Sequence, residues 1–234
     1  MPTPRQTFKA KLANLETVTG IGVNQPSPSL VEFLANQGFD QIFIDCEHAG
    51  PGIESVVEMA RAARAGGAAT ILRPWSREPG LVRHFLDAGI DGLIAPDIET
   101  GEQVQQMLDV IAGTAAGDWE NTHFIALVES QRGIDNLDEI LSVKGLDAIQ
   151  IGPVDLALSM GLPRRPVSDE VKEVSLQAFR RARDAGVSSG GPVWMLGLEE
   201  MVEAGANIFM YMSDNLLGAA AKRAMTDLKK AQNR

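Results

Sequence analysis

Short apolar runs alternate with amphipathic segments from one end of the chain to the other. Several runs are unbroken rather than alternating, which is typical of strands buried on both faces of a parallel sheet. The pattern predicts eight strands: Thr19–Asn24, Gln41–Glu47, Ala69–Pro74, Gly92–Asp97, Phe124–Glu129, Ala148–Pro153, Gly190–Trp194 and Ile208–Ser213. It predicts a helix after each one: Ser29–Gln37, Ile53–Ala65, Gly80–Ala88, Glu102–Ile111, Ile134–Lys144, Glu170–Ala185, Leu198–Ala204 and Leu216–Lys230.

A weak repeat marks the places where a predicted helix gives way to a strand. The four tetrapeptides are Gln37–Asp40, Ala88–Asp91, Lys144–Asp147 and Ala204–Asn207, and each has Gly in second place. Glycine suits the left-handed position that follows a helix, because other residues are strained there. We therefore interpret these glycines as structural.

Eight strand–helix units in strict order leave two architectures, a closed barrel or a doubly wound sheet. The barrel is favoured because the count is eight and no glycine-rich dinucleotide loop follows the first strand. At 234 residues the chain is slightly shorter than the ~250 residues of a typical barrel. The prediction is a single α/β domain, a (β/α)₈ TIM barrel that spans residues 1–234, with no linker inside it.

Composition and charge narrow the class of protein. A formal net charge of −10 argues against nucleic acid or an anionic membrane surface as a partner, since both require clustered Lys and Arg. The first residues contain no apolar signal segment, and no apolar run approaches the ~20 residues needed to cross a bilayer. Cys46 is the only cysteine, which excludes a disulfide framework and a thiolate metal cluster. We expect a cytoplasmic protein.

Polar residues gather where the predicted strands end. In a barrel these carboxyl ends form the active-site mouth. The residues concerned are Asp45, Glu47, His48, Arg73, Asp97, Glu129 and Asp155. Such a set at five strand ends is hard to explain by packing, so the pattern predicts an enzyme active site.

Two of these carboxylates indicate a metal site. Glu129 and Asp155 follow neighbouring strands, and oxygen ligands of this kind suit Mg²⁺ or Mn²⁺. One such carboxylate alone would more often be a helix cap or a surface group; the pair beside His48 and Arg73 favours metal binding. His48 is the expected base, because it ends a strand beside carboxylates that could orient it.

The other reactive side chains are expected to have no catalytic role. His84 falls within a predicted helix and His123 opens the fifth strand at the opposite face, so both are expected to serve packing or the surface. Cys46 is expected to be a small buried residue. No Lys ends a predicted strand at the mouth, so no Schiff base is expected.

Taken in order, these segments resemble the HpcH/HpaI family of class II, pyruvate-dependent aldolases. The similarity covers nearly the whole chain. It rests on Ile44–Ala49 (a D-x-E-H box), Leu72–Pro74, Leu86–Gly89, Val128–Glu129 and Ile151–Leu156 (G-P-x-D). Each motif is weak alone, but together and in this order they are specific.

The resemblance implies an aldehyde-lyase that splits or forms a 4-hydroxy-2-oxo acid, from pyruvate or an analogue and an aldehyde, through a metal-stabilised enolate. It implies that Glu129 and Asp155 bind a divalent metal (Mg, Mn or Co). Backbone groups around Gly152, Pro153 and Val154 would hold the substrate carboxylate. His48 would be the acid/base, with Asp87 or Asp45 raising its basicity, and Arg73 would stabilise the enolate oxygen.

The chain also departs from the family pattern. The long arm with a G-x-R-G motif before the fifth strand is replaced by the short stretch Ile111–Asn121, which has no Arg. Leu127 stands where a Gln is usual, Ala157 replaces a frequent Ser, and Asp97 replaces an uncharged residue. From the added carboxylate and the missing Arg we expect uncharged aldehydes to be preferred, with Leu127 and Trp75 as apolar contacts.

Two alternatives remain, of which the first keeps the enolate chemistry and the second lacks it. One is a 2-oxo acid decarboxylase or an acyl-CoA-type lyase that uses the same enolate site. The other is a non-catalytic, metabolite-binding barrel, which would not need the base that His48 offers.

The resemblance further implies a homo-oligomer, a hexamer in the family, with helices exchanged near the C-terminus. The segment Leu216–Lys230 carries Leu216, Leu217, Ala220 and Ala224 as an apolar stripe, which could instead pack on its own barrel.

Overall fold

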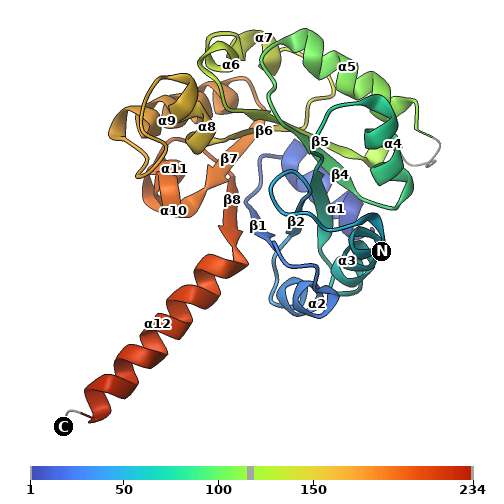
Figure 1. The fold of residues 1–234 in the computed structure, drawn as a ribbon. Helices are drawn as coiled ribbons and strands as arrows, with labels where there is room; N and C mark the ends of the chain where they lie inside the picture. The colour runs from blue at the N-terminus through green and yellow to red at the C-terminus, as the bar shows by residue number, and fades with distance from the viewer. Residues whose placement is uncertain (1, 115–118, 233–234) are drawn as a thin grey trace.

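The computed structural model describes residues 2–114 and 119–232, and its core is a closed barrel of eight parallel strands (Figure 1). The strands pair in chain order and β8 closes the barrel on β1. They are β1 (Val18–Gly22), β2 (Gln41–Asp45), β3 (Ala69–Arg73), β4 (Gly92–Ala95), β5 (His123–Val128), β6 (Ala148–Ile151), β7 (Ser188–Pro192) and β8 (Ile208–Met212). The predicted TIM barrel is confirmed, and all eight predicted strands are present.

Helices surround this barrel, and Figure 1 shows one exception, α12, which projects away from it. The helices are α1 (Pro4–Ala13), α2 (Pro28–Asn36), α3 (Ile53–Ala65), α4 (Pro79–Asp87), α5 (Gly101–Ala112), α6 (Gln131–Asp135), α7 (Leu137–Leu141), α8 (Pro153–Ser159), α9 (Asp169–Asp184), α10 (Val193–Leu196), α11 (Leu198–Glu203) and α12 (Ser213–Gln232), with a 3₁₀ turn at Trp119–Asn121. The single helix predicted over Ile134–Lys144 is wrong. The chain there forms α6 and α7, which meet at Asn136. The pattern also missed α1, α8 and α10.

Alternation along the strands separates two apolar cores. Residues that face outward pack with the surrounding helices in one large cluster. Residues that face inward form a smaller cluster inside the barrel, which includes Ile71, Ile94, Ile125 and Leu127. Phe8 and Leu12 of α1 belong to this inner cluster and are 1% exposed, so α1 closes the end of the barrel where the strands begin.

Four Asp or Asn side chains staple the strands together at that closed end. Each one accepts a hydrogen bond from a backbone N–H near the start of the preceding strand. The N···O distances are 2.9 Å for Thr19 to Asp40, 2.9 Å for Thr70 to Asp91, 2.8 Å for Phe124 to Asp147 and 2.9 Å for Ser189 to Asn207. These four acceptors are the last residues of the repeated tetrapeptides, so the repeat encodes a strand-to-strand bond as well as a glycine turn.

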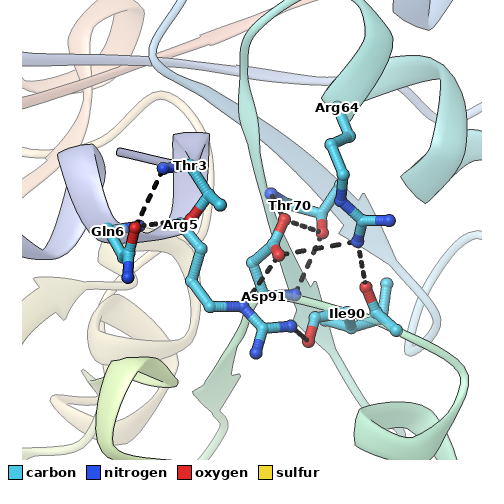
Figure 2. A network of polar contacts seen from close by, with 8 residues as sticks. Thr3, Arg5, Gln6, Arg64, Thr70, Ile90 and Asp91 are labelled. Atoms are coloured by element: carbon cyan, nitrogen blue, oxygen red, sulfur yellow. Dashed lines mark hydrogen bonds and ion pairs between the residues drawn. The ribbon is translucent and has the colours of Figure 1, made fainter. Parts of the chain in front are cut away.

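Helix α1 is matched to this ring by charge. Lys11, Arg5 and Lys9 pair with Asp40, Asp91 and Asp147 respectively, at 2.5, 2.9 and 3.3 Å. The fourth position, Asn207, is uncharged and instead donates to the backbone oxygen of Glu16. Figure 2 shows Arg5 and Arg64 converging on Asp91, whose other oxygen accepts from Thr70. The N-terminal helix is thus a plug held by three ion pairs.

In the part of the chain that the structure describes, none of the helices has the length and apolarity needed to cross a membrane.

Candidate active site

A cavity of about 630 Å³ opens at the carboxyl ends of the strands, where the sequence predicted the active site. Its floor is formed by inward-facing side chains of the strands: Phe43, Ile94, Leu127, Gln150 and Met210. Its walls carry Asp45, His48, Arg73, Glu129 and Asp155, together with Gly152, Pro153 and Val154. The structure therefore brings together most of the residues predicted for the site, but the cavity is not lined by Glu47, Trp75, Asp87 or Asp97.

Arg73, the last residue of β3, is held rigidly by the last residue of β2. Its Nε and Nη2 donate to the two carboxylate oxygens of Asp45 at 3.0 and 2.6 Å, and Nε also lies 3.0 Å from Oε2 of Glu47. The guanidinium lies 5.8 Å from the centre of the Phe43 ring. In the described part of the chain no hydrogen bond engages Nη1. Arg73 therefore keeps one two-hydrogen donor for a ligand in the cavity.

Asp45 is the hub of the β2 end. Besides Arg73 it binds the backbone N–H groups of Glu47 at 3.0 Å and His48 at 3.3 Å. Burial alone would raise the pKa of Asp45, but these bonds and the charge of Arg73 hold it below its ordinary value of 3.8. Asp45 is thus an ionised anchor that fixes both Arg73 and the loop that carries His48.

The His48 ring stands at the edge of the cavity, with its side chain 65% exposed. The carboxylate nearest to it is Glu47, whose Oε2 is 3.9 Å from Nε2. Asp45 contacts the backbone of His48, so the structure does not show Asp45 orienting the ring as expected. Glu47 occupies that position instead.

Asp87, the other expected partner of His48, is not near it. It is the last residue of α4, and helices of a barrel end on the side where the next strand begins. The chain enters β4 soon afterwards through Asp91. This residue is one of the four Asp or Asn acceptors at the closed end of the barrel, which we call the staple ring. Asp87 is exposed there and does not line the cavity. A single chain therefore does not support its assignment to the active site.

Glu129 follows β5 directly and is 6% exposed. Its Oε1 accepts the backbone N–H of Asp97 at 3.0 Å, and Asp97 has a φ of 53°, a left-handed value that Asp tolerates better than most residues. Gly152 lies so close that a Cβ there would sit 2.5 Å from Oε2 of Glu129. Burial, and then the charges of Asp97 and Asp155, raise the pKa of Glu129 to about 7. The charge of Arg73 opposes this rise but does not cancel it, so Glu129 is a buried carboxylate with only partial compensation.

This arrangement fits a divalent cation. Asp155, in the first turn of α8, is near enough to raise the pKa of Glu129, and its own Oδ1 is 3.7 Å from Nη2 of Arg164. Among the described residues, no group of three or more His, Cys, Asp or Glu side chains is placed to hold a metal ion. Glu129 and Asp155 would thus provide two oxygen ligands and leave the other positions to water and substrate.

The remaining reactive groups lie where packing explains them. Cys46 is buried, and burial raises the pKa of its thiol to about 12. His123 is fully buried with its ring 4.7 Å from that of Phe8, and burial and the charges of Lys9 and Arg5 lower its pKa well below 6.5. Trp75 packs edge-on against Phe85 and does not line the cavity, so the apolar contact expected from it is wrong.

Several cavity residues were missed at the sequence level: Asn24, Gln150, Arg164, Arg165, Trp194, Asp214 and Asn215. Arg164 and Arg165 change the expected charge of the mouth, because Glu47 and Asp97 do not line the cavity whereas these two arginines do. The preference expected for uncharged aldehydes rested on an added carboxylate at Asp97 and a missing Arg, and the lining of the cavity supports neither ground.

Comparison with known proteins identifies the family to which the chain belongs. The family model described as "HpcH/HpaI aldolase/citrate lyase" matches residues 19–211, so the chain belongs to that family. A hydroxypyruvate/pyruvate aldolase of Roseovarius nubinhibens is 32% identical over 213 residues, which cover 81% of this chain and 83% of the relative. A 2-keto-3-deoxy-L-rhamnonate aldolase of Escherichia coli K12 is 29% identical over 206 residues, covering 78% of this chain and 77% of the relative. Among solved structures, a family protein from Burkholderia cenocepacia J2315 superposes with a TM-score of 0.87 at 26% identity, covering 96% of this chain and 99% of that one.

Proposed function

We propose that this protein is a metal-dependent (class II) aldolase that cleaves or forms a 4-hydroxy-2-oxo acid, with pyruvate or a close 2-oxo acid as one product and an aldehyde as the other. One observation carries the proposal. A buried Glu129 with a partly exposed Asp155 close by, a clamped arginine with a free donor and an accessible histidine face the same cavity. The names of the relatives, which include pyruvate aldolases, support it.

The metal would be Mg²⁺, Mn²⁺ or Co²⁺, held by Glu129 and Asp155. When bound, it would supply positive charge beside the oxygens of the 2-oxo acid and so make its C3 protons more acidic. The backbone around Gly152, Pro153 and Val154 lines the same side of the cavity and would receive the substrate carboxylate. In the first turn of α8 the N–H of Val154 has no acceptor within the described residues, as expected at a helix start.

Arg73 would stabilise the negative charge that develops on the C2 oxygen. Among the described residues its Nη1 donors have no hydrogen-bond partner, and the Asp45 clamp fixes their direction before substrate arrives. Donors that are already oriented stabilise a transition state without a reorganisation cost.

His48 would move the proton. In cleavage it takes the proton of the C4 hydroxyl, the C3–C4 bond breaks, and the electron pair passes to C3 and the C2 oxygen. The released aldehyde leaves, and His48 returns a proton to C3 to give the 2-oxo acid. In synthesis the same ring removes a proton from C3. Its position at the cavity edge beside Glu47 allows exchange with water.

The test is exchange of the pyruvate C3 protons into D₂O, followed by NMR with and without Mg²⁺ or Mn²⁺. We expect metal-dependent exchange in the wild type and none in Glu129→Gln. A decarboxylase or an acyl-CoA-type lyase would also exchange these protons, but would not add pyruvate to an aldehyde panel. Absence of exchange would favour the metabolite-binding alternative. Borohydride with pyruvate should leave the protein mass unchanged, and a trapped adduct would contradict the metal-dependent mechanism.

A further inference from the structure

One polar side chain of the cavity floor has no role in the proposed chemistry. Gln150 faces into the barrel from β6, lines the cavity and is 6% exposed. Its Nε2 is buried without a hydrogen-bond partner. A buried amide that lacks a partner destabilises a fold, so its presence at this position calls for an explanation.

The neighbours of Gln150 within the barrel cannot supply that partner. On the adjacent strands it pairs in register with Leu127 of β5 and Gly190 of β7. Along its own strand the inward-facing positions are Ala148 and Gly152. None of these four side chains is polar. A polar side chain could not take the place of Gly190, because a Cβ there would sit 1.8 Å from the backbone oxygen of Ile208.

These four described neighbours supply no partner, whereas the cavity that Gln150 lines is open to one. A half turn about the last side-chain torsion exchanges its nitrogen and oxygen with almost no change in shape. Either polar atom can thus be turned toward a ligand. The amide lies two residues before Gly152, beneath the side of the cavity that would receive the substrate carboxylate.

We propose that Gln150 is a substrate-binding residue whose side-chain amide donates from the cavity floor to the carboxylate of the bound 2-oxo acid. The inference rests on the proposed function for the identity of the ligand. It adds a residue that makes the site selective for an oxygen-rich, anionic end group. A hydrogen-bonding site of this kind discriminates strongly against ligands that leave its polar group unpaired.

The experiment compares Gln150→Met with Gln41→Met. Methionine has nearly the length and volume of glutamine but no amide. Gln41 is a suitable control because it also faces into the barrel, is fully buried and has both amide atoms unpartnered, but does not line the cavity. Two quantities are measured: the Tm of the metal-free protein, and the Kd for oxalate, a planar dicarboxylate, with the Mg²⁺-loaded protein by calorimetry.

We expect Gln150→Met to raise Tm by about 2–4 °C, since an unpaired buried amide is removed. The same variant should weaken oxalate binding roughly 10- to 100-fold, as for a lost hydrogen bond to a charged group. Gln41→Met should raise Tm without changing the Kd. An unchanged Kd in Gln150→Met, whatever happens to Tm, would overturn the inference. If the wild type binds oxalate but exchanges no pyruvate protons, the proposed function fails while this binding role stands.

Discussion

At the scale of single residues, the site combines one arginine that is strongly held with one carboxylate that is poorly compensated. Arg73 satisfies both oxygens of Asp45, and that ion pair is largely buried, with side-chain exposures of 13% and 8%. Glu129 is equally buried, and the charge of Arg73 only partly offsets its burial and the charges of Asp97 and Asp155. The chain thus prepares a fixed positive group on the β2–β3 side and leaves the β5–β6 side negative.

We expect Arg73→Lys to lower kcat about 10²- to 10³-fold, the usual effect of losing one oriented donor at a developing oxyanion. Lysine keeps the charge but cannot bind both oxygens of Asp45 and still point a second donor into the cavity. Steady-state kinetics with saturating metal would measure the effect, and thermal unfolding would show whether the fold survives. Activity within a few-fold of the wild type would remove Arg73 from the mechanism.

The raised pKa of Glu129 predicts that the free energy of unfolding of the metal-free protein depends on pH. Its pKa in the fold, about 7, exceeds its ordinary value of 4.5, so the folded state binds the proton more tightly than the unfolded state. The corresponding stability is complete below pH 4.5 and is lost as pH rises through 7. This rise in pKa corresponds to roughly 3 kcal/mol. Urea unfolding across this range should show the free energy of unfolding falling, with a smaller fall in Glu129→Gln or with excess Mg²⁺. Identical pH profiles for the wild type and Glu129→Gln would contradict the prediction.

The arginines at the rim revise the expected aldehyde preference. The Arg164 side chain is 57% exposed, and its Nη2 lies 3.7 Å from Oδ1 of Asp155. A bound metal would engage the Asp155 carboxylate, and the Arg164 guanidinium would then be free to bind a carboxylate of the aldehyde substrate. We expect succinic semialdehyde to be accepted at least as well as a neutral aldehyde of similar length. Arg164→Ala should raise KM for the semialdehyde roughly 3- to 10-fold, as for a partly exposed ion pair, and leave the neutral aldehyde unchanged. Arg180→Ala, on the exposed Arg180–Glu173 pair, is the control. A wild type that prefers the neutral aldehyde would restore the original charge argument.

At the scale of elements, the sequence predicts the repeated strand–helix units and misses features that occur only once, such as α1. Eight strands and most helices follow from apolar periodicity, and the strand-end rule is enough to bring His48, Arg73, Glu129 and Asp155 together. Helix α1 was missed because it has no strand before it and its buried face is only Phe8 and Leu12. Gln150 was missed because a polar residue in an apolar run gives no sign of its direction. The register of β6 with its neighbouring strands shows that Gln150 faces into the barrel. The pairing of Asp45 with Arg73 likewise needs the structure, since it joins side chains of adjacent strands.

The staple ring gives a prediction for α1. Asp91 is 2% exposed, accepts from Thr70 and pairs with Arg5 (Figure 2). Asp91→Ala would leave buried donors of Thr70 and Arg5 without this acceptor, and we expect it to lower the free energy of unfolding by about 3–5 kcal/mol. Asp138→Ala is the control, because Asp138 pairs with Arg181 but is 83% exposed and should cost less than about 1 kcal/mol. Equal effects in the two variants, measured by urea unfolding, would show that the ring does not hold the plug.

At the scale of the whole molecule, α12 is the element that a single chain does not explain. Its 20 residues extend away from the barrel (Figure 1), and only Ser213 at its start is buried. The alternative that its apolar stripe packs on its own barrel is therefore wrong. Leu216, Leu217, Met225 and Leu228 are between 43% and 56% exposed. Most of the stability of a helix in a protein comes from packing of its apolar face, and clustered exposed apolar side chains mark an interaction surface.

We expect a second copy of this chain to cover α12, as the resemblance to hexameric aldolases implied. Leu217 and Leu228 lie on one side of the helix, three turns apart, whereas Thr226 lies on the opposite side. Leu217→Glu combined with Leu228→Glu should therefore reduce the assembly to a smaller species in light scattering at micromolar concentration. Thr226→Glu adds a charge to the same helix without touching the apolar side, and should leave the mass unchanged. A wild type that is already monomeric under these conditions would contradict the prediction. So would a doubly substituted chain that keeps the wild-type mass, since the surface that joins the copies would then lie elsewhere on the barrel.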